Sequence, residues 1–316
     1  MTLRCRRLVL LLVLALMFAP DEWTLRVASA ATSSSTSGTK IQKKSTSSRS
    51  TRRRRRGRRL PPDGVVWARN AVVLDPVTNE ILFEKNASAS VPIASLSKLM
   101  TAIVFLEQNP DLTRSVEVTR PDLAGAGRTQ LYNRERVALG DLLHMSLMCS
   151  DNAATRVLTR ESGLSREDFL ARMNRRSVEL GLERTRFVEF TGLDERNVST
   201  ATDCARMLRA AASVPTIQEI MKQRSHSFTS EYRTRRRYHI VGSTNRLLYG
   251  SYEVRGGKTG FILEAGYCFA TWIHTQQRDL IAVVLGAPTG ATRFADVARL
   301  VKRTTEPTPP TISTRR

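Results

Sequence analysis

The sequence predicts an α+β protein with a three-layer arrangement, in which the first and last strands of the folded region share one antiparallel sheet flanked by helices. Two observations carry this prediction. Strand-like segments at residues 71–85 and 252–285 enclose a long block with helical hydrophobic spacing, and an amphipathic helix at residues 291–302 follows them. The helical block is therefore expected to be an inserted, all-α lobe, with a site in the cleft between the lobes.

The first sheet elements are expected at residues 71–74 and 81–85. Both are rich in β-branched and aromatic or aliphatic residues, and the segment between them, residues 75–79, contains Asp, Pro and Asn. These residues favour turns, so the two strands are expected to pair antiparallel.

The central block predicts four helices after a loop at residues 122–136. Their expected ranges are 139–148, 153–161, 166–180 and 201–212. Ser199 or Thr200 is placed to cap the last of them. Three further strands are then expected at residues 252–257, 266–274 and 280–285, because these segments alternate or are β-rich and are separated by turn residues.

Residues 1–30 have the features of a secretory signal peptide. Arg4, Arg6 and Arg7 precede an apolar run at residues 8–18, and Ala28-Ser29-Ala30 offers a small-residue cleavage site. The run has about half of the ~20 residues that span a bilayer. We therefore expect export to the periplasm or cell wall, with cleavage favoured over retention as a membrane anchor.

Residues 31–60 are rich in Ser, Thr and Arg and contain no aromatic residue, so we expect a disordered tether. The chain has a net charge of +21, and most of it lies in residues 1–60. An exported protein meets no genome, so nucleic acid is not an expected partner. The tether is expected either to be merely solvated or to contact anionic envelope polymers or lipid head groups loosely. Residues 304–316 are expected to form a disordered tail.

The four cysteines, Cys5, Cys149, Cys204 and Cys268, are widely spaced. Cys5 lies in the expected signal peptide, and the other three form neither a disulfide framework nor a metal motif. At most one disulfide could form, and none is predicted; no metal and no cofactor is expected either.

Residues 92–101 are predicted to begin an amphipathic helix with Ser95 as its N-cap. Lys98 lies three residues further on, on the same face of one turn. A hydroxyl and an amine in this arrangement can act as nucleophile and base, provided that burial or a nearby cation keeps the amine neutral. The alternative is a structural cap beside a solvated lysine, since Ser37 and Lys40 show the same spacing without any such context.

Two further motifs follow. Ser150-Asp151-Asn152 lies between two predicted helices, and Lys258-Thr259-Gly260 lies at the end of a predicted strand. Taken singly, the first could be a helix cap and the second a turn.

Taken together and in this order, the three motifs resemble those of the penicillin-binding proteins and related β-lactamases. The stretches 92–102, 191–194, 199–203, 258–261 and 265–268 are most similar to the low-molecular-mass D-alanyl-D-alanine carboxypeptidases and endopeptidases, and the resemblance extends from about residue 65 to 302. It implies a β-lactamase/transpeptidase-like domain at residues 61–303. The family's substrate is a peptidoglycan stem peptide, and its covalent inhibitors are β-lactams.

The resemblance also implies catalytic roles. Ser95 would attack the carbonyl between two D-alanines and form an acyl-enzyme. Lys98 would take the proton of Ser95. Ser150, placed by hydrogen bonds to Lys98 and Lys258, would relay a proton to the leaving amine.

Substrate binding is implied for six residues: Asn152, Lys258, Thr259, Gly260, Phe261 and Arg293. Asn152 would hold the peptide amide, and Lys258 and Thr259 would face the terminal carboxylate. The backbone N–H groups of Ser95 and Phe261 would hold the oxyanion.

Two side chains have two interpretations each, and a run of arginines departs from the expected pattern. Arg293 could bind the carboxylate or be a solvated helix charge. Cys149 could be a reactive thiol beside Ser150, or a buried small hydrophobe, which is the favoured interpretation. The run of arginines at residues 235–237 is expected to give the cleft rim a positive potential.

Four functions remain in competition. A carboxypeptidase is the main prediction, and an endopeptidase that cleaves cross-links is the alternative. A β-lactamase would need a carboxylate to activate water, and Glu189 and Glu195 do not lie in the expected Glu-x-x-Leu-Asn pattern. A non-catalytic cell-wall-binding protein would have no need of the full set of motifs.

Overall fold

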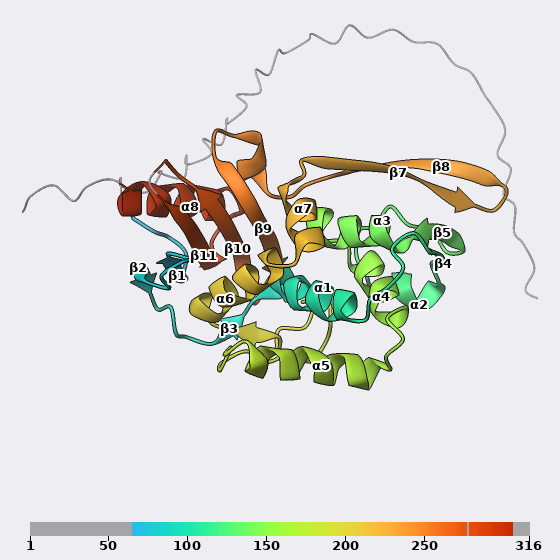
Figure 1. Ribbon diagram of the computed structural model, residues 1–316, viewed down its shortest axis with the longest axis horizontal. Helices are drawn as coiled ribbons and strands as arrows, with labels where there is room; N and C mark the ends of the chain where they lie inside the picture. The colour runs from blue at the N-terminus through green and yellow to red at the C-terminus, as the bar shows by residue number, and fades with distance from the viewer. Residues whose placement is uncertain (1–64, 277, 306–316) are drawn as a thin grey trace, which may run out of the picture. The chain divides into compact units, whose positions relative to one another are not determined.

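A five-stranded antiparallel sheet lies at the centre of one of the two lobes, with the strand order β2-β1-β11-β10-β9 (Figure 1). The computed structural model describes residues 65–276 and 278–305. The strands are β1 Asn70–Leu74, β2 Ile81–Lys85, β9 Glu253–Ile262, β10 Gly266–His274 and β11 Asp279–Ala287. The strands at the two ends of the described chain therefore share one sheet, as predicted.

The central strands of this sheet are buried on both faces. In β11, Ile281 and Val283 join one hydrophobic cluster, whereas Leu280 and Ala282 join another on the opposite face. Successive side chains of a strand point to opposite faces, so a strand covered on both sides is apolar throughout. This explains why the segment from Leu280 to Leu285 has no polar residue.

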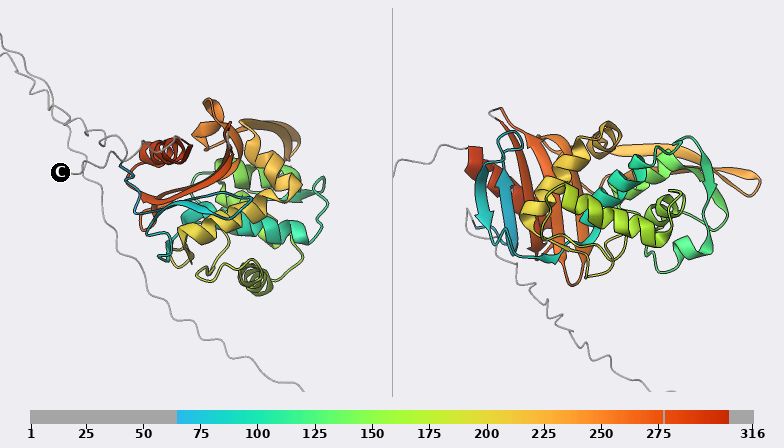
Figure 2. Two further views of the ribbon diagram at one scale, coloured as in Figure 1. Left: turned by 60° about the vertical axis from the view of Figure 1, so that its left-hand side comes forward. Right: turned by 60° about the horizontal axis from the view of Figure 1, so that its bottom comes forward.

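Helices cover both faces, which confirms the predicted layers (Figure 2). Helix α8, Gly290–Thr305, packs on one face against β11 and β10, and α6, Ala201–Ala212, crosses the other. Thr200 caps α6 by accepting a hydrogen bond from Asp203 N. Behind α6, the central helix α1, Ser97–Glu107, is enclosed by the helices of the second lobe.

The second lobe contains most of the predicted helices. Its helical elements are α2 Arg120–Leu123, α3 Leu139–His144, the π-helical turn η2 Met145–Cys149, α4 Asn152–Arg160 and α5 Arg166–Glu179. The predicted loop at residues 122–136 is partly wrong, because α2 ends inside it and a strand begins at Glu135.

The lobe is not all-α, as was expected, because it also carries a four-stranded antiparallel sheet in the order β4-β5-β7-β8. The strands are β4 Ser115–Glu117, β5 Glu135–Ala138, β7 Ser225–Tyr232 and β8 Arg235–Gly242. The helix α7, Pro215–Lys222, and the short helix η3, Arg246–Tyr249, flank the β7–β8 hairpin in sequence and were not predicted either. The expected α+β class stands, and the sheet is an addition to it.

The arginines at residues 235–237 do not line the rim of the cleft near the predicted site. They begin β8 at the tip of the hairpin, whereas Gly242 ends it (Figure 1). Gly242 is seven positions after Arg235, and an extended chain covers about 23 Å over that number of positions.

Several expectations lie outside the described residues. These are the signal peptide at 1–30, the tether at 31–60 and most of the tail at 304–316, although Thr304 and Thr305 belong to α8. Among the residues that are described, no helix is both long and apolar enough to span a bilayer.

Two segments bring the predicted motifs together. A short pairing between β3, Val91–Pro92, and β6, Val198–Ser199, leads into the 3-10 turn η1, Ala94–Leu96, which precedes α1. Strand β9 passes against η1, and η2 leads into α4 on the other side. The three motifs therefore meet where the two lobes join.

Candidate active site

Ser95 lies in the 3-10 turn η1, immediately before α1. Its hydroxyl accepts a hydrogen bond from Lys98 Nζ at 3.0 Å, and the residue is 9% exposed. The prediction that Ser95 caps the helix is wrong, because α1 begins at Ser97 without a side-chain cap. A 3-10 turn precedes the helix, so the Ser95 hydroxyl is aimed at the amine rather than at a backbone N–H.

Two glycines press against the nucleophile turn from different sides. A Cβ on Gly192, which has φ +83°, would lie 2.0 Å from the carbonyl oxygen of Ala94. A Cβ on Gly260 would lie 3.0 Å from the backbone nitrogen of Ser95. Ala94 itself has a positive φ of 50°. The loop at Gly192 thus approaches the turn more closely than any other residue type would allow, and strand β9 makes a tight contact at Gly260.

Lys98 is fully buried and has three oxygen partners. Its Nζ lies 3.0 Å from Ser95 Oγ, 2.6 Å from Asn152 Oδ1 and 2.5 Å from the carbonyl oxygen of Thr191. A neutral amine has two N–H donors and one lone pair. If the two carbonyl-type oxygens take the donors, the lone pair is left to accept the proton of Ser95. The surroundings therefore favour a base.

Burial lowers the pKa of Lys98 from 10.5 to about 7. The carboxylate of Glu189 opposes this shift and raises the pKa, whereas the charge of Arg156 lowers it. Burial is the largest cause, because removing an ammonium group from water disfavours its charged form. A large fraction of Lys98 is thus neutral at neutral pH, as the sequence prediction required.

Ser150 faces the second lysine. Lys258 Nζ donates to Ser150 Oγ at 2.7 Å and to the carbonyl oxygen of Thr259 at 2.9 Å. The expected hydrogen bond between Ser150 and Lys98 is not formed, because Asn152 and Thr191 occupy the donors of Lys98. Burial lowers the pKa of Lys258 well below its usual value, and the nearby Lys98 adds to the shift.

The Ser-Asp-Asn motif is both a helix cap and a part of the site. Asp151 caps α4, because its side chain accepts a hydrogen bond from Ala154 N. The side chain of Asn152 does not cap the helix. Its Oδ1 accepts a hydrogen bond from Lys98 Nζ, and its Nδ2 donates one to the carbonyl oxygen of Ala126 at 2.8 Å. Ser150 has a left-handed backbone with φ 65°, which directs its hydroxyl towards Lys258.

Strand β9 carries the third motif in its interior, so the strand runs further than residues 252–257. Thr259 Oγ1 shares a hydrogen bond of 2.6 Å with Thr244 Oγ1, a residue that the sequence analysis did not single out. Phe261 is 45% exposed and stacks on Tyr267 with a 4.2 Å centroid separation. Nothing in the sequence around Thr244 marks it, since a lone threonine forms no motif.

Arg293 is not a solvated helix charge. Its Nη1 donates to the carbonyl oxygens of Gly260 at 3.1 Å and Cys268 at 3.4 Å, and its guanidinium lies over the rings of Tyr267 and Phe294. Burial lowers its pKa. The cation is therefore held against the carbonyl oxygens of Gly260 in the Lys-Thr-Gly motif and of Cys268 in the neighbouring strand β10.

Glu189 organises the loop that holds the carbonyl of Thr191. Its carboxylate accepts hydrogen bonds from the backbone N–H groups of Thr191, Gly192 and Leu193. These bonds tie the carboxylate to its own loop. A backbone carbonyl has no sequence signature, so the contact of Thr191 with Lys98 could not be predicted.

Cys149 is a small packed residue rather than a reactive thiol. Its Sγ donates to the carbonyl oxygen of Met145 at 3.2 Å, and burial raises its pKa to about 11. Reactive cysteines have lowered pKa values, so the favoured interpretation is supported. Cys149, Cys204 and Cys268 are free thiols.

Comparisons with known proteins agree with this geometry. The profile of the D-alanyl-D-alanine carboxypeptidase family matches residues 59–289. A D-alanyl-D-alanine endopeptidase of Escherichia coli K12 is 33% identical over 73% of this chain and 75% of its own. The D-alanyl-D-alanine carboxypeptidase DacF of Bacillus subtilis 168 is 30% identical over 74% of this chain and 61% of its own.

Solved structures show the same fold. Penicillin-binding protein D2 of Listeria monocytogenes, in its cefotaxime-bound form, is 30% identical and has a TM-score of 0.68, with 78% of this chain and all of that chain covered. The Streptomyces K15 DD-transpeptidase is 25% identical with a TM-score of 0.72, over 76% of this chain and 97% of that one. Since the family profile covers well over half of the sequence, the chain belongs to the D-alanyl-D-alanine carboxypeptidase family of serine DD-peptidases.

Proposed function

We propose that the protein is a penicillin-sensitive D-alanyl-D-alanine carboxypeptidase that acts on peptidoglycan stem peptides through an acyl-enzyme on Ser95. The observation that carries this proposal is the arrangement of Lys98. Its amine is buried, has a pKa of about 7, and lies 3.0 Å from the Ser95 hydroxyl. Such an amine can accept the serine proton at neutral pH and return it later.

Acylation begins when Lys98 Nζ takes the proton of Ser95 and Ser95 Oγ attacks the carbonyl carbon between the two D-alanines. The backbone N–H groups of Ser95 and Phe261 hold the resulting oxyanion. Ser150, whose oxygen is held by Lys258 at 2.7 Å, passes its proton to the nitrogen of the leaving D-alanine and takes up the proton of the Lys98 ammonium, so that Lys98 is neutral again. Water then attacks the ester carbonyl and gives a proton to Lys98 Nζ, which passes it to Ser95 Oγ as the ester bond breaks and the shortened peptide leaves.

The two ends of the substrate meet different elements. Asn152 holds the peptide amide on the acyl-donor side, next to α4. Thr259 and Lys258 face the terminal carboxylate of the leaving D-alanine, and Arg293 adds positive charge from behind the strand. A small carboxylate beside this strand is what a carboxypeptidase substrate supplies.

The test combines penicillin and a stem pentapeptide. Intact mass after a brief exposure to penicillin should increase by one adduct, and the Ser95→Ala variant should show none. The wild type should release D-alanine from the pentapeptide, giving a tetrapeptide. Equal labelling of the Ser95→Ala variant would show that the nucleophile is another residue.

An endopeptidase that cleaves peptidoglycan cross-links is the second candidate. Three relatives named D-alanyl-D-alanine endopeptidase are 33%, 32% and 33% identical to this chain, and they cover 73%, 76% and 63% of it. Digestion of purified cross-linked dimers and monomeric pentapeptides, followed by mass spectrometry, separates the two activities. An endopeptidase would convert dimers to monomers faster than it releases D-alanine.

We further propose that the protein is exported and acts in the periplasm or cell wall. The support is the basic and apolar order of residues 4–18 and the small-residue site at 28–30. Loose contact of the arginine-rich segment with anionic envelope polymers or lipid head groups is part of this proposal. Fractionation of cells, with the N-terminal residue of the mature chain determined by mass spectrometry, tests both export and cleavage.

A further inference from the structure

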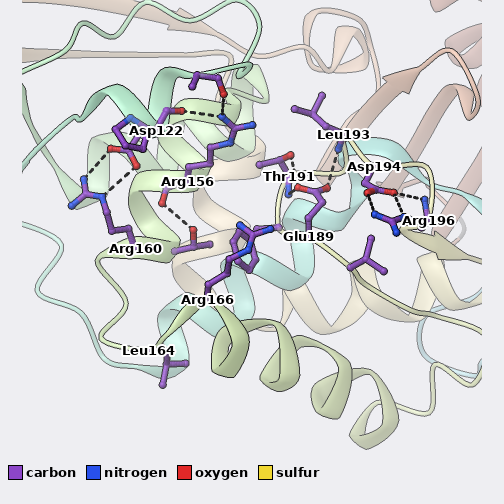
Figure 3. Close-up of a pocket in the computed structure, with 15 residues that line it drawn as sticks. Asp122, Arg156, Arg160, Leu164, Arg166, Glu189, Thr191, Leu193, Asp194 and Arg196 are labelled. Atoms are coloured by element: carbon purple, nitrogen blue, oxygen red, sulfur yellow. Dashed lines mark hydrogen bonds and ion pairs between the residues drawn. The ribbon is translucent and has the colours of Figure 1, made fainter.

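An arginine-rich pocket of about 810 Å³ adjoins the active site in the helical lobe (Figure 3). Helices α2, α4 and α5 and the loop at residues 188–196 contribute its walls. Thr191 lies on the wall and also accepts the hydrogen bond of Lys98, so the pocket and the base share one residue. None of the residues in the three motifs lines it.

The charges of the pocket do not cancel locally. Arg160 pairs with Asp122 at 3.1 Å, and Arg196 pairs with Asp194 at 2.6 Å. The third carboxylate, that of Glu189, is occupied by backbone N–H groups of its own loop. The guanidinium groups of Arg156 and Arg166, which also line the pocket, form no ion pair with a carboxylate among residues 65–276 and 278–305.

Arg156 donates to the backbone carbonyls of Asp122 and Ala124, which carry no net charge. Arg166 stacks over the ring of Phe190, 4.8 Å from its centroid, and no ion pair joins it to any described residue (Figure 3). Arg166 is also the first residue of α5, where the helix dipole disfavours a cation. The positive charges of Arg156 and Arg166 are therefore not neutralised by ion pairs within the described part of the chain.

The position of the pocket indicates which part of a substrate would reach it. Asn152 and Arg156 are four residues apart on α4, so they lie on one face of the helix. Under the proposed function, Asn152 holds the acyl-donor side of the peptide, whereas Thr259 and Arg293 hold the leaving D-alanine. The chain that precedes the scissile bond therefore leaves the active site along α4, towards the pocket.

We propose that this pocket is a subsite for a free carboxylate on the acyl-donor part of the stem peptide, bound by Arg166 and Arg156. The proposal rests on the proposed function for the direction in which the peptide runs. A planar guanidinium binds a carboxylate through two parallel hydrogen bonds, and such charge-assisted bonds are stronger than neutral ones. An acidic stem peptide would thereby be preferred over one whose carboxylates are amidated.

The test measures binding without turnover, in the Ser95→Ala background. Three synthetic pentapeptides end in D-alanyl-D-alanine. Two carry one free carboxylate, on the first or the second residue before the D-alanines, and the third carries carboxamides at both positions. We expect at least one acidic peptide to bind about tenfold more tightly than the amidated one, as measured by calorimetry.

Added substitutions assign this preference to the pocket. Arg166→Gln should reduce the tenfold ratio to about twofold, and Arg166→Lys should restore part of it. Arg175→Gln is the matched control, because Arg175 lies on the same helix, is exposed and does not line the pocket. It should leave the ratio unchanged.

The outcomes separate this proposal from the proposed function. Equal dissociation constants for all three peptides, a lack of binding to any of them, or a preference that survives Arg166→Gln would overturn the subsite. Release of D-alanine by the Ser95 enzyme would then still support the peptidase. Conversely, a preference that depends on Arg166, in a protein that releases no D-alanine, would retain the subsite and reject the peptidase.

Discussion

Lys98 Nζ lies 3.0 Å from Ser95 Oγ and has no solvent-exposed surface. Burial lowers its pKa to about 7, and only the neutral amine can accept the serine proton. Acylation should therefore require the deprotonated form and become faster as the pH rises through about 7. Below that pH, the rate should fall about tenfold per unit, because the neutral fraction falls by that factor.

Stopped-flow measurement of penicillin acylation between pH 5 and 9 tests this prediction, with the fluorescence of a labelled penicillin as the signal. The acid limb should have an apparent pKa of about 7. A limb near the usual lysine pKa, or a rate independent of pH over this range, would remove Lys98 from the role of base.

Two charged neighbours should move this limb in opposite directions. Glu189 raises the pKa of Lys98, so Glu189→Gln should lower it and shift the acid limb to lower pH. Arg156 lowers the pKa of Lys98, so Arg156→Gln should shift the limb to higher pH by a smaller amount. The same acylation assay measures both shifts.

Arg175→Gln removes the same charge as Arg156→Gln, but from the exposed surface of α5, and should leave the limb in place. Thermal melting of each variant checks that the Glu189 loop is still folded. Shifts of the same sign for both substitutions would mean that loop rearrangement, not charge, controls the base.

The close approach of Gly192 to Ala94 should be essential. An alanine at Gly192 adopts an unfavourable backbone with φ +83° and places Cβ 2.0 Å from the Ala94 oxygen. We expect Gly192→Ala to lower the free energy of unfolding by about 2–4 kcal/mol. Acylation by penicillin should also fall, because the displaced loop moves the carbonyl of Thr191 away from Lys98.

Gly163→Ala is the matched control for this prediction. Gly163 has the same φ of +83°, and nothing lies within 4 Å of an added Cβ. Its cost should be about 1 kcal/mol, from the backbone alone, and acylation should not change. Urea unfolding measures both variants, and equal losses of stability would show that the contact with Ala94 has no importance of its own.

The sequence could predict the three motifs but not how they meet. Ser95 and Lys98 share one turn, so their contact follows from spacing alone. Ser150 and Lys258 are 108 residues apart, and only the tertiary fold brings their side chains to 2.7 Å. The predicted hydrogen bond between Ser150 and Lys98 is wrong because Lys98 instead donates to the backbone carbonyl of Thr191. That contact also depends on the tertiary fold and has no sequence signature.

The sheet of the second lobe escaped prediction partly because some of its buried side chains are polar. Ser230 of β7 and His239 of β8 are buried, and both hydrogen-bond to the buried carboxylate of Glu135 on β5. Strands are recognised by apolar residues at every second position. Here, mutual hydrogen bonding satisfies the buried polar groups, which interrupt the apolar alternation that Phe228 and Val241 begin.

Arg293 should distinguish substrates by their terminal carboxylate. Its guanidinium is bound to the carbonyl of Gly260, the residue that follows Thr259 in β9, and adds a positive charge there. Arg293→Gln should lower kcat/KM for a pentapeptide with a free C-terminal carboxylate about tenfold, the effect of losing a charge-assisted interaction. Kinetics with the same peptide carrying a C-terminal amide should show a much smaller loss.

Arg303→Gln provides the comparison on the same helix, since Arg303 lies on the exposed part of α8 over Phe83. It should leave the ratio between the acidic and amidated peptides unchanged. If Arg293→Gln lowers kcat/KM equally for both peptides, the residue acts by supporting β9 rather than by attracting the carboxylate. The hydrogen bonds of Arg293 to Gly260 and Cys268 would then be its whole contribution.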